Sequence, residues 1–454
     1  MQVIKYIKHY KSDIFDTVKL SLPIMFGRLG AVMMGVADNI MVGKIGYNEI
    51  AASGISNAIC FLLAIIPIGL LVIGSPMVSA EASRQNKQGC VNIMKSCIQV
   101  SFLVSLVIWV ILWLIGANFQ YLGQPKDVTD IVQPFYTLII TSIFPLMFFI
   151  AVEQFTDGLE KTWISMFFNI TGFCVNVGIN WLLVYGNWGC PALGLVGAGI
   201  GTLSARTYMA VGIWLAVNYL KDFNNFPLST MNIFAIDKPT FNSVLKTGLP
   251  SGFQFFFEVS ALSFMAVVCG WFGAASLAAH NIALNIASVT YMISSAFATG
   301  GSIRVGMALG MQNKREILRA ANTSFMLVTA WMSTTLILLL IFNQYLIQFY
   351  TIDAQVLQIS YYLVIITAFF QISDGVQIAA LGALRALADV NVPALISFCS
   401  YWIVGIPAGC ALAYIFHLEV YGIWIGMLIG LTISSVLLTT RFYNIVERHT
   451  FADS

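Results

Sequence analysis

Long apolar runs separated by short polar stretches make up almost the whole chain. An apolar run of about 20 residues crosses a bilayer as a helix, whereas a membrane β-barrel needs alternating segments of about ten residues. The pattern therefore predicts an all-α integral membrane protein with twelve transmembrane helices. The expected spans are residues 17–41, 50–79, 93–116, 132–156, 163–186, 193–219, 243–269, 277–306, 319–343, 357–383, 393–416 and 420–441.

One segment of the chain occurs twice in the same direction. Residues 18–89 align without a gap on residues 245–316, and 18 of the 72 aligned pairs are identical. The repeat predicts two parallel, pseudo-symmetric bundles of six helices, which is one of the two main plans of secondary transporters. The shared motifs include Leu22-Pro23 with Leu249-Pro250 and Gln85-Asn86-Lys87 with Gln312-Asn313-Lys314.

The longest polar connection lies between the sixth and seventh spans, where the repeat places the join between the halves. We therefore predict an N-lobe at residues 1–220, a cytoplasmic linker at 221–242 and a C-lobe at 243–454. Nothing in the sequence requires more than a monomer.

Composition places the chain in a lipid bilayer. Apolar residues make up 59% of it and charged residues 9%, against about a quarter charged in soluble proteins. The net charge of +2 is too small for a nucleic-acid-binding protein, so no nucleic-acid partner is expected.

The basic residues indicate the orientation, because cytoplasmic loops of membrane proteins are enriched in Lys and Arg. If both termini lie on one side, that side carries 17 of the 22 basic residues, and the other carries only Lys44 and Lys126. The remaining three, Arg28, Arg206 and Arg304, fall within spans. We therefore predict a multi-pass protein of the cytoplasmic (inner) membrane with both termini in the cytoplasm.

Four acidic residues lie inside apolar spans: Asp38, Glu153, Glu258 and Asp374. An acidic side chain at the centre of a membrane helix costs about 2.5–3.5 kcal/mol on insertion scales, so such residues are usually functional. The alternative is structural, with each acid paired to a buried arginine or capping a helix. Arg304 is the main basic candidate in the second half, and Glu153 is as easily explained by an ion pair with Lys161 or Arg28.

Polar stripes accompany the two acids of the second half. Gln254 shares a helix face with Glu258, and Gln371 and Gln377 flank Asp374. In the eighth span, Asn281, Asn285, Ser288 and Ser295 form a third stripe. Together the three polar stripes predict a water-filled cavity in which Glu258 and Asp374 either bind Na⁺ through their oxygen atoms or take up a proton.

Asp38 is expected to have a different polar pocket. Asn176 and Asn180 share a helix face, and Thr202 of the next span could join them around Asp38. The alternative is ordinary hydrogen bonding between helices, worth about 0.6 kcal/mol on average. In the repeat alignment Asp38 aligns with Met265, and Glu258 aligns with Ala31, so each half carries its own acidic site.

Enzyme function is not expected. An intramembrane enzyme needs a nucleophile–base pair or a histidine-rich site, but the four histidines are scattered and no GxSxG, HExxH or HxxxD occurs. His280 is interpreted as a buried histidine with satisfied hydrogen bonds. A phosphate-binding GxxxxGK[ST] is also absent, so no nucleotide or other cofactor is predicted apart from the transported ion.

These features together resemble the multidrug and toxic-compound extrusion (MATE) family, specifically its norfloxacin-efflux-type branch. The resemblance covers nearly the whole chain, and it depends on the order of several short sequence motifs rather than on any single motif. They are Ala37-Asp38-Asn39-Ile40-Met41-Val42-Gly43, Gly158-Leu159-Glu160-Lys161-Thr162, Asn176-Val177-Gly178-Ile179-Asn180-Trp181, Phe257-Glu258-Val259 and Ser373-Asp374-Gly375-Val376-Gln377.

The resemblance implies twelve helices in two bundles that form a V, exchanging inward Na⁺ or H⁺ for outward organic cations and drugs. It implies cation binding at Glu258 and Asp374, and a first-lobe polar site at Asp38, Asn176 and Asn180. Asn180 replaces an aspartate of some other branches, and Phe370 stands where some relatives carry a tyrosine. A flippase for lipid-linked oligosaccharides or cell-wall precursors, from the same superfamily, is the alternative.

Overall fold

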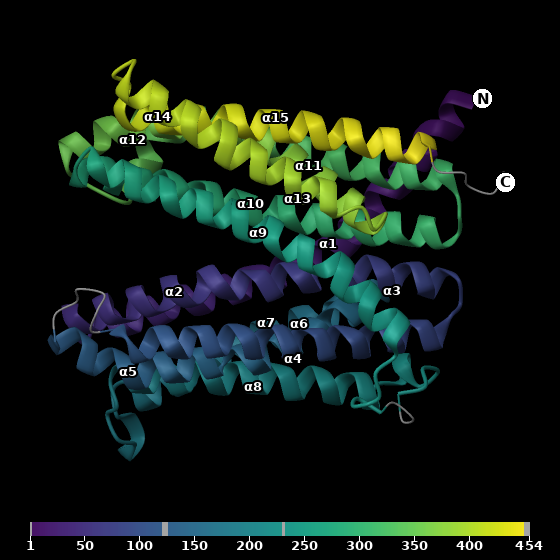
Figure 1. Cartoon of the computed structure of the whole chain (residues 1–454), viewed down its shortest axis with the longest axis horizontal. Helices are drawn as coiled ribbons and strands as arrows, with labels where there is room; N and C mark the ends of the chain where they lie inside the picture. Colours follow the sequence, from purple (N-terminus) through teal and green to yellow (C-terminus); the bar gives the residue numbers. More distant parts are fainter. Residues whose placement is uncertain (1, 120–125, 229–231, 449–454) are drawn as a thin grey trace. The chain divides into compact units, whose positions relative to one another are not determined.

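The computed structural model describes residues 2–119, 126–228 and 232–448, and this part of the chain is helical without a strand (Figure 1). The helices cover most of each predicted span, and several extend beyond them, as α1 does by beginning at Gln2 rather than at residue 17. They are α1 (Gln2–Gly43), α2 (Tyr47–Leu71), α3 (Gly74–Ser83), α4 (Lys87–Ala117), α5 (Lys126–Thr141), α6 (Ile143–Gly158), α7 (Thr162–Leu183), α8 (Leu195–Tyr219), α9 (Lys238–Trp271), α10 (Ala274–Gly310), α11 (Lys314–Gln348), α12 (Ala354–Ala386), α13 (Asn391–Phe398), α14 (Ile406–Tyr414) and α15 (Glu419–Arg448).

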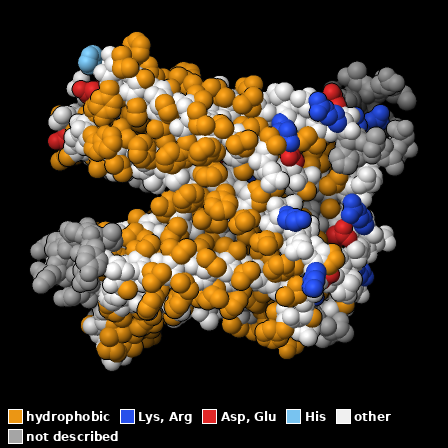
Figure 2. Space-filling model, in the orientation of Figure 1, with side chains coloured by type: hydrophobic (Ala, Val, Ile, Leu, Met, Phe, Trp, Pro, Cys, Tyr) orange, Lys and Arg blue, Asp and Glu red, His pale blue; other side chains and the backbone are white. Residues whose placement is uncertain are grey.

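Twelve stretches of the described chain are long and apolar enough to cross a membrane, so the predicted number of spans is confirmed. Three of these stretches contain more than one helix: Asn48–Ser83, Ile131–Gly158 and Asn391–Tyr414. In the last one, a π-helical turn at Cys399–Gly405, η4, joins α13 to α14. Figure 2 shows hydrophobic side chains covering most of the helix surface on the face drawn.

Contacts divide the chain into two compact units. The first unit comprises Phe26–Gly252, and the second comprises Met1–Met25 with Phe253–Ser454. These boundaries do not coincide with the predicted ones at residues 220 and 243, because they fall inside α1 and α9. Each boundary lies two residues beyond the repeated Leu-Pro, at Pro23 in α1 and at Pro250 in α9.

Polar contacts explain why the first turns of α1 group with the second unit. Arg304 of α10 and Arg319 of α11 both form salt bridges with Asp13, at 2.7 and 2.6 Å. Arg304 also donates to the hydroxyl of Thr17 at 2.8 Å. In α9, the Ser251 hydroxyl donates to the carbonyl of Gly69 within the first unit at 2.8 Å.

The repeated Gln-Asn-Lys motif forms the same turn in both copies. Gln85 and Gln312 have positive φ angles of 59° and 56°. The next residue caps the following helix: Asn86 accepts a hydrogen bond from the Gly89 amide, and Asn313 accepts one from the Glu316 amide. An asparagine at this position satisfies an amide that the helix itself leaves without a partner.

The helices that carry the predicted site residues pack against one another within each unit. In the first unit α7 packs on α8, and in the second unit α12 packs on α10, α11 and α15. A core of buried apolar residues from α9, α10, α12 and α15 surrounds Trp424 and Tyr401. The polar residues on these helices are therefore held in fixed positions by apolar packing.

Candidate cation-binding sites

Glu258 of α9 lies in a chain of polar contacts within the second unit. The Gln254 amide nitrogen donates to Glu258 Oε2 at 3.1 Å, one helical turn away. Arg385 of α12 donates to the Gln254 carbonyl oxygen at 2.5 Å, and its charge also acts on Glu258. Glu258 is partly exposed whereas Gln254 is buried, so the carboxylate is supported from within the protein.

Asp374 of α12 is the second acid of this group. Its side chain is buried, and it interacts electrostatically with Glu258. Tyr401 lies close enough to both acids to interact with each of them, and its hydroxyl accepts a hydrogen bond from the Gln377 amide at 2.7 Å. The structure therefore brings Glu258, Asp374, Gln254 and Gln377 into one polar cluster, which we call the C-site, completed by Tyr401 and Arg385.

Two residues of the C-site were not expected from the sequence. Arg385 was counted among the cytoplasmic positive charges, but it is buried in the last turn of α12, with 7% of the residue exposed. Tyr401 stands in the π-turn η4, where an extra residue per turn shifts side chains off the regular helical faces. The position of Arg385 inside the apolar string Ala383-Leu384-Arg385-Ala386 was the available signal.

Among the described residues, neither of two further predicted members of this pocket forms a hydrogen bond with Glu258 or Asp374. The carbonyl oxygen of Gln371 accepts a hydrogen bond from the Thr335 hydroxyl of α11 at 3.0 Å. Asn281 is exposed on α10 together with Asn285 and Ser288. Within the described residues, no hydrogen bond joins Asn281 to Glu258 or Asp374, so the third stripe does not complete the C-site in this structure.

Asp38 of α1 accepts hydrogen bonds from two side chains in the first unit. Asn180 Nδ2 donates to one carboxylate oxygen at 2.5 Å, and the Thr202 hydroxyl donates to the other at 3.1 Å. Asn176 accepts from Asn180 at 3.4 Å and is fully buried. We call this group of four the N-site, and its geometry agrees with the sequence-based grouping.

Glu153 of α6 belongs to neither the C-site nor the N-site and has its own partners. It accepts a hydrogen bond from Asn169 at 3.1 Å, and the Arg28 charge acts on it. Lys161, the other candidate, instead forms a salt bridge with Asp222 at 3.1 Å. The structure thus places Glu153 within the electrostatic influence of Arg28 and not in a salt bridge with Lys161.

The structure corrects two further expectations about buried charged or polar groups. Arg304 does not neutralise either acid of the C-site, because it is bound to Asp13 and Thr17. His280 is fully buried beside Trp424, but neither ring nitrogen has a hydrogen-bond partner among the described residues. The prediction of a satisfied histidine is therefore wrong for this structure.

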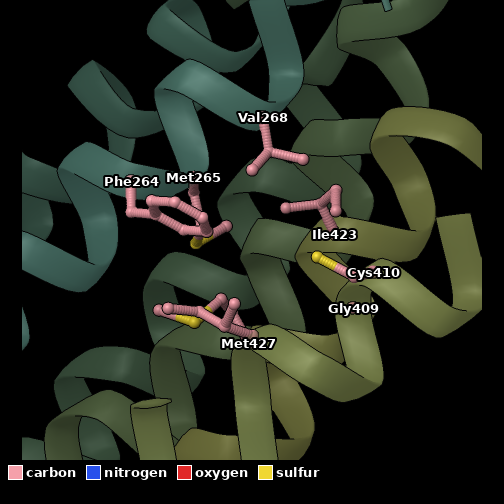
Figure 3. A pocket seen from close by; sticks show the side chains of 8 residues that line it. Phe264, Met265, Val268, Gly409, Cys410, Ile423 and Met427 are labelled. Atoms are coloured by element: carbon pink, nitrogen blue, oxygen red, sulfur yellow. The ribbon is translucent and has the colours of Figure 1, made fainter. Parts of the chain in front are cut away.

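The second unit also contains a pocket among α9, α14 and α15, and Figure 3 shows that its labelled side chains are apolar. None of the C-site residues lines it, and it offers no charged group to a cation. Its lining residues are Phe264, Met265, Val268, Ile406, Gly409, Cys410, Ile423 and Met427.

Comparisons with known proteins identify the family. The sequence profile of the MatE family matches residues 23–182 and 250–410, which together exceed half of the chain. A multidrug resistance protein NorM from Aliivibrio fischeri is 30% identical over 445 residues, covering 95% of each chain. The chain belongs to the MatE family. The two matched segments begin 227 residues apart, which is the offset of the internal repeat.

Further matches agree with this membership. A probable multidrug resistance protein NorM from Mesorhizobium japonicum is 29% identical and covers 95% of this chain and 94% of its own. Two solved structures share the MatE fold at a TM-score of 0.87 and 17% identity. They are the eukaryotic MATE transporter AtDTX14, with 97% of each chain covered, and an outward-facing multidrug resistance MATE transporter of the MOP superfamily, with 96% covered. Since MatE proteins are transporters, the family membership argues against an enzyme.

Proposed function

We propose that this MatE protein is an antiporter that exports structurally diverse organic cations in exchange for inward Na⁺ or H⁺. The observation that carries the proposal is the C-site. Two carboxylates, Glu258 and Asp374, interact inside a membrane-spanning unit, where an acidic side chain is costly and usually serves ion movement. The similarity to proteins named for multidrug resistance supports drugs as the exported cargo.

The coupling follows from competition between two conformations. The bound inward ion would stabilise one conformation and the drug the other, and each ligand acts only through its different affinity for the two states. A membrane potential contributes about 2.3 kcal/mol per charge for each 100 mV, enough for an inward cation to drive concentrative export. The N-site, with Asp38 held by Asn180 and Thr202, is proposed as a second binding site for the ion or the drug.

Cationic cargo is preferred over the anionic headgroups that a flippase handles. Three arginines within the helices are engaged by the protein itself: Arg304 by Asp13, Arg385 by Gln254, and Arg206 by the Ser142 hydroxyl at 2.6 Å. We further propose that the protein acts as a monomer in the cytoplasmic (inner) membrane with both termini in the cytoplasm.

Efflux from cells tests this proposal. We expect Glu258→Gln and Asp374→Asn to reduce ethidium efflux to the level of cells without the transporter, because each removes a charge that attracts the coupling ion. The exposed acid Glu447 provides the matched control, and Glu447→Gln should keep normal efflux. Undiminished efflux by the Glu258→Gln/Asp374→Asn double variant, at equal membrane expression, would refute the role of the C-site.

A further inference from the structure

Arg385 is a buried cation placed beside a proposed cation site. Only 7% of the residue is exposed, and its guanidinium carbon lies 4.8 Å from the centre of the Phe255 ring. It also donates to the Gln254 carbonyl oxygen at 2.5 Å. Burying a guanidinium is costly unless its donors are satisfied, so this contact fixes both side chains.

The chemistry of the two neighbours determines which way the Gln254 amide points. A guanidinium has donors only, so the amide atom that faces Arg385 must be the carbonyl oxygen. The amide nitrogen then faces Glu258 Oε2, at 3.1 Å, and a carboxylate is the acceptor that this nitrogen requires. The orientation is therefore imposed by Arg385 on one side and Glu258 on the other.

This orientation matters for Na⁺, because hard cations bind through carboxylate and carbonyl oxygens. The C-site offers the carboxylates of Glu258 and Asp374 and the buried Gln377 carbonyl oxygen, which has no hydrogen-bond partner among the described residues. Gln254 is adjacent to Glu258 but presents N–H groups to it. Its oxygen would be a further ligand if it were free to turn.

Resting on the proposed function, we infer that Arg385 is a positioning residue that withholds the Gln254 oxygen from a cation at the C-site and thereby weakens Na⁺ binding there. Its positive charge acts in the same direction, since it repels a second cation in the same cluster. Arg385 would thus lower the affinity of the C-site for Na⁺ and set how strongly the site retains this ion.

Binding of ²²Na⁺ to the purified full-length protein in lipid nanodiscs, at one fixed pH, tests this inference. We expect Arg385→Met to bind Na⁺ about tenfold more tightly than the unmodified protein, as one additional charge-assisted contact would produce. Arg385→Lys keeps a charged donor for the Gln254 oxygen and should stay close to the unmodified affinity. In a Gln254→Leu background, Arg385→Met should gain less, because no amide oxygen remains to be released.

A second variant covers the case in which Arg385→Met does not fold, as judged by size-exclusion chromatography. Gln254→Glu gives Arg385 a charged partner and replaces the N–H groups facing Glu258 with an oxygen, so it should also tighten Na⁺ binding. The inference would be overturned if every folded variant had the Na⁺ affinity of the unmodified protein. It would also be overturned if none of the proteins bound Na⁺. If Glu258→Gln still blocks efflux in that case, the proposed function survives and only the role of Arg385 fails.

Discussion

At the scale of single residues, charged side chains inside the spans divide into two classes. Asp13 forms salt bridges with both Arg304 and Arg319, which leaves its carboxylate little capacity for a ligand. Glu258 and Asp38, by contrast, are held mainly by amide and hydroxyl donors and are partly exposed. A carboxylate held by neutral donors keeps its charge available, which suits a site that a mobile cation visits.

The first class predicts a loss of stability on substitution. Asp13→Asn removes the charge that two arginines share, and breaking such a buried pair typically costs about 3–5 kcal/mol. Arg304 and Arg319 keep 15% and 19% of their side chains exposed, so we expect the lower end of that range. A lower midpoint of thermal unfolding in detergent, compared with the exposed control Asp16→Asn, is the measurement. Equal midpoints for the two variants would show that the cluster does not stabilise the fold.

The sequence predicted the grouping of the N-site residues because they follow simple helical spacing. Asn176 and Asn180 are one turn apart on α7, and Thr202 is on the neighbouring α8. It missed Tyr401 because the π-turn changes the spacing locally, and it misplaced Arg385 because the predicted span ended at residue 383. The hydrogen bond between Arg385 and Gln254 depends on how two helices distant in sequence pack together. The spacing of polar residues along a single helix does not reveal such a contact.

At the scale of helices, α1 and α9 share an unusual feature that reflects the repeat. Each contains the Leu-Pro of the repeated motif, and each changes compact unit two residues later. The repeat predicted that the two helices correspond, and the capping turns at Asn86 and Asn313 confirm that correspondence locally. The change of unit inside the helix was not predicted, because hydrophobicity shows only that a span exists and not which helices it packs against.

Close helix packing at the start of α9 predicts a second stability effect. A Cβ atom on Gly252 would lie 2.4 Å from the Ile66 carbonyl oxygen, a backbone atom that cannot turn away. We expect Gly252→Ala to destabilise the protein by about 1–3 kcal/mol, the usual cost of overpacking. Gly54→Ala is the matched control, because nothing lies within 4 Å of a Cβ at that position.

Unfolding midpoints of the two glycine variants, measured side by side, decide this prediction. Gly54→Ala should be neutral or slightly stabilising, since alanine loses less entropy than glycine in a helix interior. If Gly252→Ala were as stable as Gly54→Ala, the close contact between α9 and α2 would be absent from the protein in a membrane.

At the scale of the whole molecule, hydrophobicity was sufficient to predict the number of spans, and the resemblance carried by several ordered motifs predicted the family. The family profile matches the chain twice at the repeat offset, and the described structure has twelve stretches able to cross a membrane. The orientation in the membrane remains a prediction from the distribution of Lys and Arg. On the face drawn in Figure 2, the blue side chains of each unit lie near one end of its helices.

Reporter fusions test this orientation. We expect a green fluorescent protein fused after Ser454 to fluoresce and an alkaline phosphatase fused there to be inactive, since the first folds in the cytoplasm and the second only outside it. A phosphatase inserted between the first and second spans, beside Lys44, should be active. The reverse pattern would contradict the positive-inside argument and with it the cytoplasmic termini.

The central claim is that an inward cation, bound by the C-site acids, drives export. Transport of a fluorescent organic cation by the purified protein in liposomes, under an imposed Na⁺ gradient or separately a pH gradient, tests it most directly. We predict that at least one gradient drives uphill movement of the dye, and that Glu258→Gln abolishes the response. Dye movement that is insensitive to both gradients, or equally strong in Glu258→Gln, would contradict the account.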